Sequence, residues 1–107
     1  MQNSFRYPGS DSVNKERINK FRDIVRTSRK NHIEAVEKFD KMLEGIFVDF
    51  LANRIPENER AIRRSNFKVK FWGLVRRYKT AKMSEREEIE NRFLENWNYM
   101  IRPLHGD

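Results

Sequence analysis

Apolar residues recur at helical spacing through the first half of the chain. At about 100° per residue they fall in one stripe. The stripe comprises Ile18, Phe21, Ile24, Val25, Ala35, Val36, Phe39, Met42, Leu43, Ile46, Phe47, Phe50 and Leu51. Ser28 and His32 form a polar notch within it. Because the phase is the same on both sides of the notch, the pattern favours one long helix over about residues 12–53. The alternative is a break near Ser28–Asn31 that gives two antiparallel helices.

The second half of the chain predicts three further helices. Pro56 ends the preceding helix and suits the first turn of a short helix over about residues 57–65. Ser65 and Asn66 are candidate caps before Phe67, so the short helix either breaks there or runs on. We expect the break, followed by a helix over about residues 67–82. The inward face of that helix holds Phe67, Phe71, Leu74, Val75, Tyr78 and Ala81.

The spacing of Ser84 and Glu87 matches a capping box and predicts a final helix over about residues 85–101. Its apolar face holds Ile89, Phe93, Trp97, Met100 and Ile101, and Pro103 ends it. The sequence therefore predicts an all-α fold, a small helical bundle with a long N-terminal helix.

The 107 residues suit one domain. We expect a flexible N-terminal arm over residues 1–11, a helical domain over 12–102 and a tail over 103–107. The chain has no Cys, which excludes disulfides and Cys-based zinc sites. No apolar run approaches the roughly 18–20 residues that span a bilayer. These features predict a soluble, cytoplasmic protein.

A helix longer than about 25 residues is typical of a coiled coil or a dimer interface. The sequence thus predicts a homodimer, with a polar residue in the notch setting the register of the pair. The predicted interface residues are Phe21, Val25, His32, Val36 and Phe39.

Charge is distributed unevenly along the chain. The net charge is +7, yet residues 60–84 alone contain nine Lys or Arg and no acid. Residues 15–30 carry +5 and residues 31–59 carry −4. A cationic segment of this kind attracts polyanions. The residues predicted to contact phosphates are Arg63, Arg64, Lys68, Lys70, Arg76, Arg77, Lys79 and Lys82.

Trp72 lies away from the apolar face of its helix, among Lys and Arg residues. There it is a candidate for stacking on a nucleic-acid base. The alternative is that Trp72 and Val69 pack on a second protein surface.

Candidate chemistry is sparse. Glu34–Lys38 and Glu37–Lys41 have the spacing of helical ion pairs, which favours a solvated acidic face over a metal site. The two His residues have no partner at metal-ligand spacing, and no Gly-rich phosphate loop is present. We therefore expect no catalytic residues, no metal and no cofactor.

The segment from Arg26 to His32 places an Arg six residues before a His. It is similar to the loose Arg–His motif of the HEPN ribonucleases, a family of small all-α domains that often dimerise through that region. The resemblance covers these seven residues, and Thr27 is a weak match to the polar residue that usually follows the Arg. We prefer the interpretation as a polar notch.

The sequence as a whole predicts a non-catalytic nucleic-acid-binding protein, for DNA or RNA, whose binding is dominated by the backbone and weakly specific. The alternative is a protein-interaction module, such as an adaptor, an inhibitor or an immunity-type bundle, whose basic face meets an acidic partner. A third hypothesis is a self-assembling subunit in which basic and acidic segments pair between chains.

Overall fold

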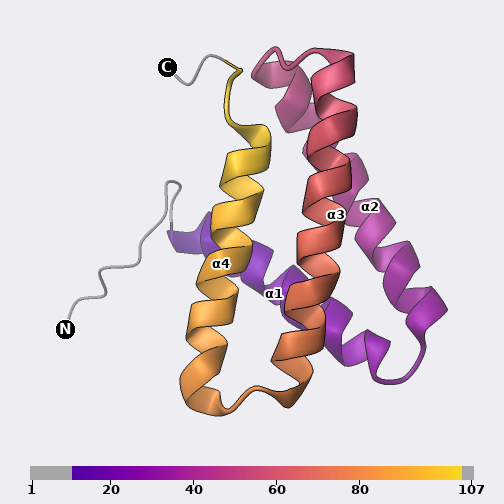
Figure 1. The fold of residues 1–107 in the computed structure, drawn as a ribbon, viewed down its shortest axis with the longest axis vertical. Coiled ribbons are helices and arrows are strands. Elements are labelled where there is room, and N and C mark those ends of the chain that lie inside the picture. Colours follow the sequence, from indigo (N-terminus) through magenta and orange to yellow (C-terminus); the bar gives the residue numbers. More distant parts are fainter. Residues whose placement is uncertain (1–10, 105–107) are drawn as a thin grey trace.

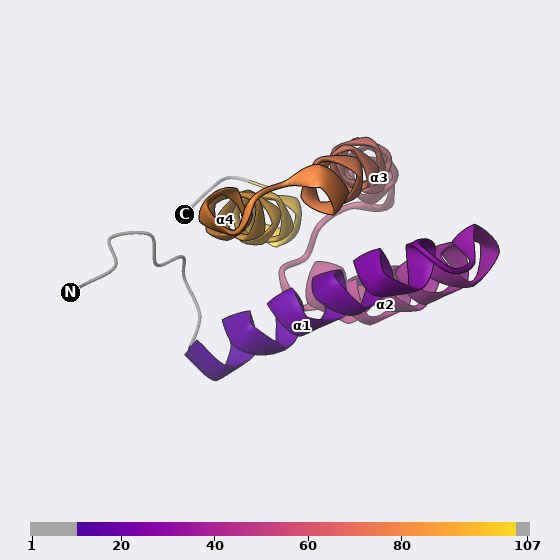
Figure 2. The ribbon, with the colours of Figure 1, turned by 90° about the horizontal axis from the view of Figure 1, so that it is seen from below.

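The computed structural model describes residues 11–104, which form α1 (Asp11–Ser28), α2 (His32–Ala52), α3 (Glu57–Thr80) and α4 (Met83–Ile101). The predicted all-α bundle is confirmed, and residues 11–104 contain no strand. The hairpins α1–α2 and α3–α4 form two layers (Figures 1 and 2). The molecule measures 39 × 38 × 20 Å. Its shortest dimension equals about two helix diameters of 10 Å.

The prediction of one long helix over residues 12–53 is wrong, and the alternative break is observed. The Thr27 carbonyl accepts hydrogen bonds from the N–H groups of Lys30 and Asn31, which closes a turn. Asn31 then caps α2, since its side chain accepts from the Glu34 N–H at 3.1 Å. An unchanged apolar phase does not discriminate between a continuous helix and a hairpin, because both halves of the hairpin face the same core.

The predicted division near residue 66 is also wrong, because α3 continues from Glu57 to Thr80. Ser65 and Asn66 lie exposed within this helix and cap nothing. A hydroxyl and an amide on a solvent-facing side cost a helix little, so tertiary packing overrides the local capping preference. The sequence placed Pro56 in the first turn of a helix, and in the structure it is the N-cap residue immediately before the first turn of α3.

The predicted cap at Ser84 is displaced by two residues. α4 begins at Met83, and the Glu85 carboxylate accepts from the Lys82 backbone N–H at 3.1 Å. Glu85 therefore satisfies the helix start in the way that Glu87 was expected to. The predicted end at residue 101 is confirmed.

The turn between α2 and α3 is a Schellman motif. Arg54 adopts the left-handed conformation at φ 57°, and its N–H donates to Leu51. The Ile55 N–H donates to the Phe50 carbonyl at 2.9 Å, and both side chains are buried. This turn carries the chain from one layer to the other.

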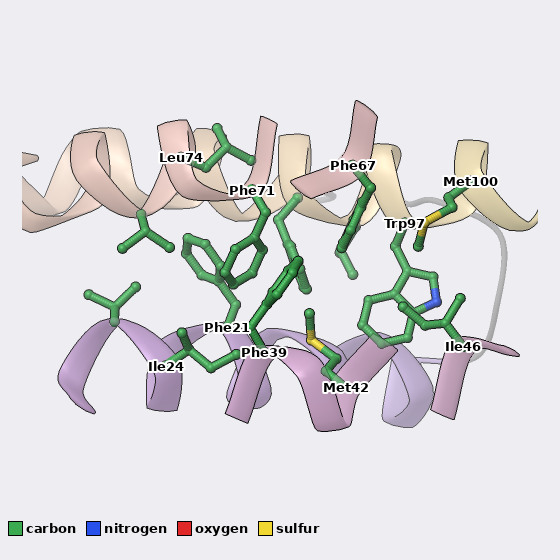
Figure 3. Packing of buried hydrophobic residues seen from close by; sticks show 14 of the residues in the cluster. Phe21, Ile24, Phe39, Met42, Ile46, Phe67, Phe71, Leu74, Trp97 and Met100 are labelled. Atoms are coloured by element: carbon green, nitrogen blue, oxygen red, sulfur yellow. The ribbon is translucent and has the colours of Figure 1, made fainter. Parts of the chain in front are cut away.

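Aromatic rings fill the space between the two layers (Figure 3). The Phe71 ring centroid lies 5.7 Å from that of Phe21, 4.6 Å from Phe39 and 5.9 Å from Phe93. Each of those three rings comes from a different helix. Phe71 therefore links all four helices in one packed cluster.

A polar network is buried beside this cluster. Glu90 is 6% exposed, and its carboxylate accepts from the Arg22 Nε at 2.7 Å and from the Tyr78 hydroxyl at 2.6 Å. The network satisfies a buried charge and joins α1, α3 and α4.

Asp11 begins α1, and the rest of the predicted N-terminal arm lies outside the described residues, as do residues 105–107 of the predicted tail. Within 11–104, no helix has the length and apolarity needed to cross a membrane.

Removing the cap of α2 is expected to weaken the hairpin. Asn31→Ala loses the acceptor for the Glu34 N–H and should lower the free energy of unfolding by about 1 kcal/mol. Urea denaturation measures this change. Asn31→Asp keeps an acceptor oxygen and should retain the stability of the original chain. An Asn31→Ala chain as stable as the original would show that this cap does not set the break.

Tyr78 is expected to make stability depend on alkaline pH. Burial and the hydrogen bond to Glu90 raise the pKa of the Tyr78 phenol. The folded protein therefore holds the phenol proton more tightly than the unfolded chain does. The resulting gain in the free energy of unfolding is complete below about pH 10, and it is lost as the pH rises toward the pKa of Tyr78 in the folded state. Denaturation measured across alkaline pH should give a flatter profile for Tyr78→Phe than for the original chain. Parallel profiles would contradict the assignment.

Candidate functional site

The basic segment lies on the outward sides of α3. Phe67, Phe71, Leu74, Val75 and Tyr78 are buried against the other helices. This packing fixes the rotation of α3 about its axis. The cationic residues between the buried positions consequently point toward solvent or toward the edges of neighbouring helices.

Seven of the eight predicted phosphate contacts have no ion-pair partner among residues 11–104. Lys68, Lys70, Arg76, Arg77 and Lys82 are exposed, and Arg64 and Lys79 are half-buried. Among residues 11–104, no acid forms an ion pair with any of these seven side chains. Like charges at helical spacing repel one another, so this surface favours an external anion.

Arg63 differs from the other eight residues of the predicted site. Its side chain is 13% exposed, and its Nε pairs with the Glu59 carboxylate at 3.1 Å. The Arg63 Nη1 also donates to the carbonyls of Met100 and Arg102, at the end of α4. Arg63 thus joins α3 to the C-terminus of α4, and we remove it from the candidate site.

Trp72 is half-buried and packs against the core. Its ring centroid lies 5.4 Å from Phe39, 5.1 Å from Phe71 and 5.6 Å from His32. Part of the ring therefore packs on α2, which was the alternative considered from the sequence. Val69 remains 74% exposed, so the second packing surface does not bury it.

A groove of about 340 Å³ separates the α1–α2 turn from α3. Its lining consists of Ser28, His32, Val36, Trp72, Val75, Arg76 and Lys79. Val36, Trp72 and Val75 supply apolar surface, and Arg76 and Lys79 supply positive charge. Within residues 11–104, no acidic side chain lines this groove.

The two basic stretches of the sequence meet beside this groove. The Arg29 Nη2 donates to the backbone carbonyl of Lys79 at 3.0 Å. Arg29 belongs to the basic run of residues 15–30, and Lys79 to the run of residues 60–84. Arg29 was missed as a site residue. The sequence marks Arg29 only as one charge in the basic run of residues 15–30, and that charge does not indicate which residues lie near Arg29 in the fold.

A second groove, of about 470 Å³, runs between α3 and α4. Lys70, Arg76, Arg77 and Arg92 line it together with Glu95. Arg76 borders both grooves, so α3 forms a basic ridge between them. Arg92 was also missed, because it stands in a stretch with net negative charge and its helix packs beside α3 only in the fold.

The break after Ser28 removes the basis of the predicted dimer interface. Phe21, Val25 and Phe39 are 3% exposed or less, because α1 and α2 fold back and bury their stripes within one chain. Val36 and His32 line the groove instead. The argument for a dimer through these five residues therefore does not hold.

The acidic face of α2 is exposed as predicted, at Glu34, Glu37, Asp40 and Glu44. The predicted pairs Glu34–Lys38 and Glu37–Lys41 do not form. Lys38 instead binds Asp23 at 2.8 Å, since the hairpin brings α1 beside α2. In the part of the chain that the structure describes, no group of acids and histidines is arranged to hold a metal.

Arg26 and His32 lie on opposite sides of the α1–α2 turn. The Arg26 guanidinium pairs with Asp23 at 3.4 Å, whereas the His32 ring packs near Trp72. Only His32 lines the groove. The structure therefore directs these two side chains to different surroundings.

No protein-family model matches this chain, and comparisons with curated proteins and with solved structures find no match.

Arg63 is expected to contribute to stability. Arg63→Ala removes two hydrogen bonds to the end of α4 and should lower the free energy of unfolding by about 1–3 kcal/mol. Arg77→Ala, an exposed arginine on the same helix, should change it by less than about 0.5 kcal/mol. Chemical denaturation compares the two variants. Equal effects would contradict the distinction between them.

Proposed function

We propose that this protein binds nucleic acid without catalysis, through the basic ridge of α3 and the adjoining end of α1. The observation that carries the proposal is the set of seven cationic side chains on and after α3 with no ion-pair partner among residues 11–104. Folding leaves this charge available for an external polyanion.

The shape of the ridge supports an extended anion over a small one. From Arg64 to Arg77 the cations follow a single helix, and at 1.5 Å per residue they span about 20 Å. Positive charge that extends over this length, on both flanks of one helix, matches several phosphates of a nucleic-acid backbone better than one isolated anion. Lys and Arg side chains bind phosphate oxygens, which carry no sequence information. Binding is therefore dominated by the backbone and weakly specific.

A second candidate, a protein-interaction module, is favoured by a different surface. Phe47, Val48 and Leu51 are 40%, 65% and 54% exposed near the end of α2. Exposed apolar side chains grouped on one helix are typical of a protein contact. This surface lies on the acidic helix and not on the basic ridge, so its partner would differ from the polyanion proposed for α3.

Binding to a generic single-stranded oligonucleotide and to a DNA duplex is expected to depend steeply on salt. Each phosphate contact contributes about 0.7–0.9 to the slope of log K against log salt concentration. Arg76→Gln or Lys68→Gln should therefore lower both the affinity and the slope. Fluorescence anisotropy over a salt series measures both quantities.

Lys41→Gln is the matched control, because it removes one exposed charge from α2 and leaves α3 unchanged. Its slope should equal that of the original chain. An equal loss in Lys41→Gln and Arg76→Gln would show that net charge alone drives binding. Absence of binding at about 50 mM salt would rule out the proposed function.

A further inference from the structure

We propose that the groove between the α1–α2 turn and α3 holds one unpaired base of a single-stranded nucleic acid. Its phosphate would lie against Arg76 and Lys79. This inference rests on the proposed function and adds to it a preference for single strands over duplexes.

The groove offers a fixed aromatic surface. Trp72 is held by Phe39 and Phe71, both of which are buried, so the indole cannot turn freely. The indole remains partly exposed and lines the groove. An aromatic ring that is already ordered loses little entropy when a base stacks on it, and every base has a face that can stack.

The charge around the groove matches a nucleotide. Arg76 and Lys79 stand at its edge, and Arg29 reaches the Lys79 carbonyl beside them. The groove on the other side of the ridge contains Glu95, which would repel a phosphate. Among the described residues no acid lines the groove beside Trp72, and unlike the other groove it combines its two cations with an aromatic ring, so it is the one suited to a base with its phosphate.

Polar groups are placed to contact the edge of a base. The Ser28 hydroxyl donates to the Val25 carbonyl at 2.8 Å, and its oxygen can still accept a hydrogen bond. The ring nitrogens of His32 form no hydrogen bond with another residue in the described range, so they can donate to or accept from a ligand. With Val36 and Val75 as apolar walls, the groove combines stacking, apolar and polar contacts.

The size of the groove limits what can enter. Its volume of about 340 Å³ is at the lower end of the range of about 300–1,000 Å³ found for small-molecule sites. A single base with its sugar is of this scale. A base that is still paired and stacked within a duplex cannot reach the groove. The proposal therefore requires an unpaired or flipped base.

The test compares three ligands of about 12 nucleotides, which is within the usual site size for single strands. They are a pyrimidine single strand, its duplex, and an abasic strand with the same sugar-phosphate backbone. Anisotropy at about 50 mM salt gives the affinities. Tryptophan fluorescence reports stacking, since Trp97 is buried at 6% exposure and Trp72 lines the groove.

The variant Val36→Phe fills the groove without changing charge, and Val69→Phe is the same substitution on the exposed ridge outside it. Circular dichroism verifies that each variant folds. Should Val36→Phe fail to fold, the abasic strand and the fluorescence of the original chain still decide the question.

We expect the single strand to bind about 5- to 150-fold more tightly than the abasic strand, the range that corresponds to stacking one base. It should quench tryptophan fluorescence, and Val36→Phe, but not Val69→Phe, should abolish the advantage. Equal affinity for normal and abasic strands, unchanged fluorescence at saturation, or a Val36→Phe chain that behaves like the original would each overturn the inference. In those cases binding by the ridge would stand, whereas failure of every ligand to bind would remove the proposed function as well.

Discussion

The fold depends on the contacts of one ring. Phe71 packs against Phe21, Phe39 and Phe93, so a single side chain of α3 contacts an aromatic ring from each of the other three helices. These contacts leave α3 only one rotation in which its apolar face is buried. A domain of this size has a small stability margin, so the burial of a few large rings outweighs most local preferences.

That rotation decides where the charge of the chain is found. With Phe71 inward, the cations of α3 point outward, and the acids of α2 lie on the outer side of their own helix. Lys38 is drawn to Asp23 by the hairpin, and Arg63 is drawn to the end of α4. Lys38 and Arg63 are therefore neutralised by neighbouring helices, whereas seven cations on and after α3 have no ion-pair partner among residues 11–104. This separation is the physical basis of the function proposed for the protein.

The same packing links stability to the candidate groove. Trp72 follows Phe71 in the chain and contacts it, so the indole belongs partly to the core and partly to the surface. The two interpretations of Trp72 made from the sequence, core packing and ligand contact, are compatible because one edge of the ring can pack while the other lines the groove. A substitution at Trp72 alone would alter both properties, whereas Val36 allows the groove to be altered with the indole retained.

The sequence by itself determined the helical class, most of the buried positions, the end of α4 and the high positive charge of residues 60–84. These follow from periodicity, composition and Pro placement, which are local properties. It did not determine the break at residues 29–31, although Asn31 followed three residues later by Glu34 is a helix-start signal. It also did not place Arg29 beside Lys79, or His32 beside Trp72. Several alternative helix boundaries have similar local capping preferences and the same apolar periodicity. Burial of the aromatic rings between the two layers decides which of these boundaries forms. Proximity between distant residues is a property of that packing, so the groove was decided by the tertiary structure alone.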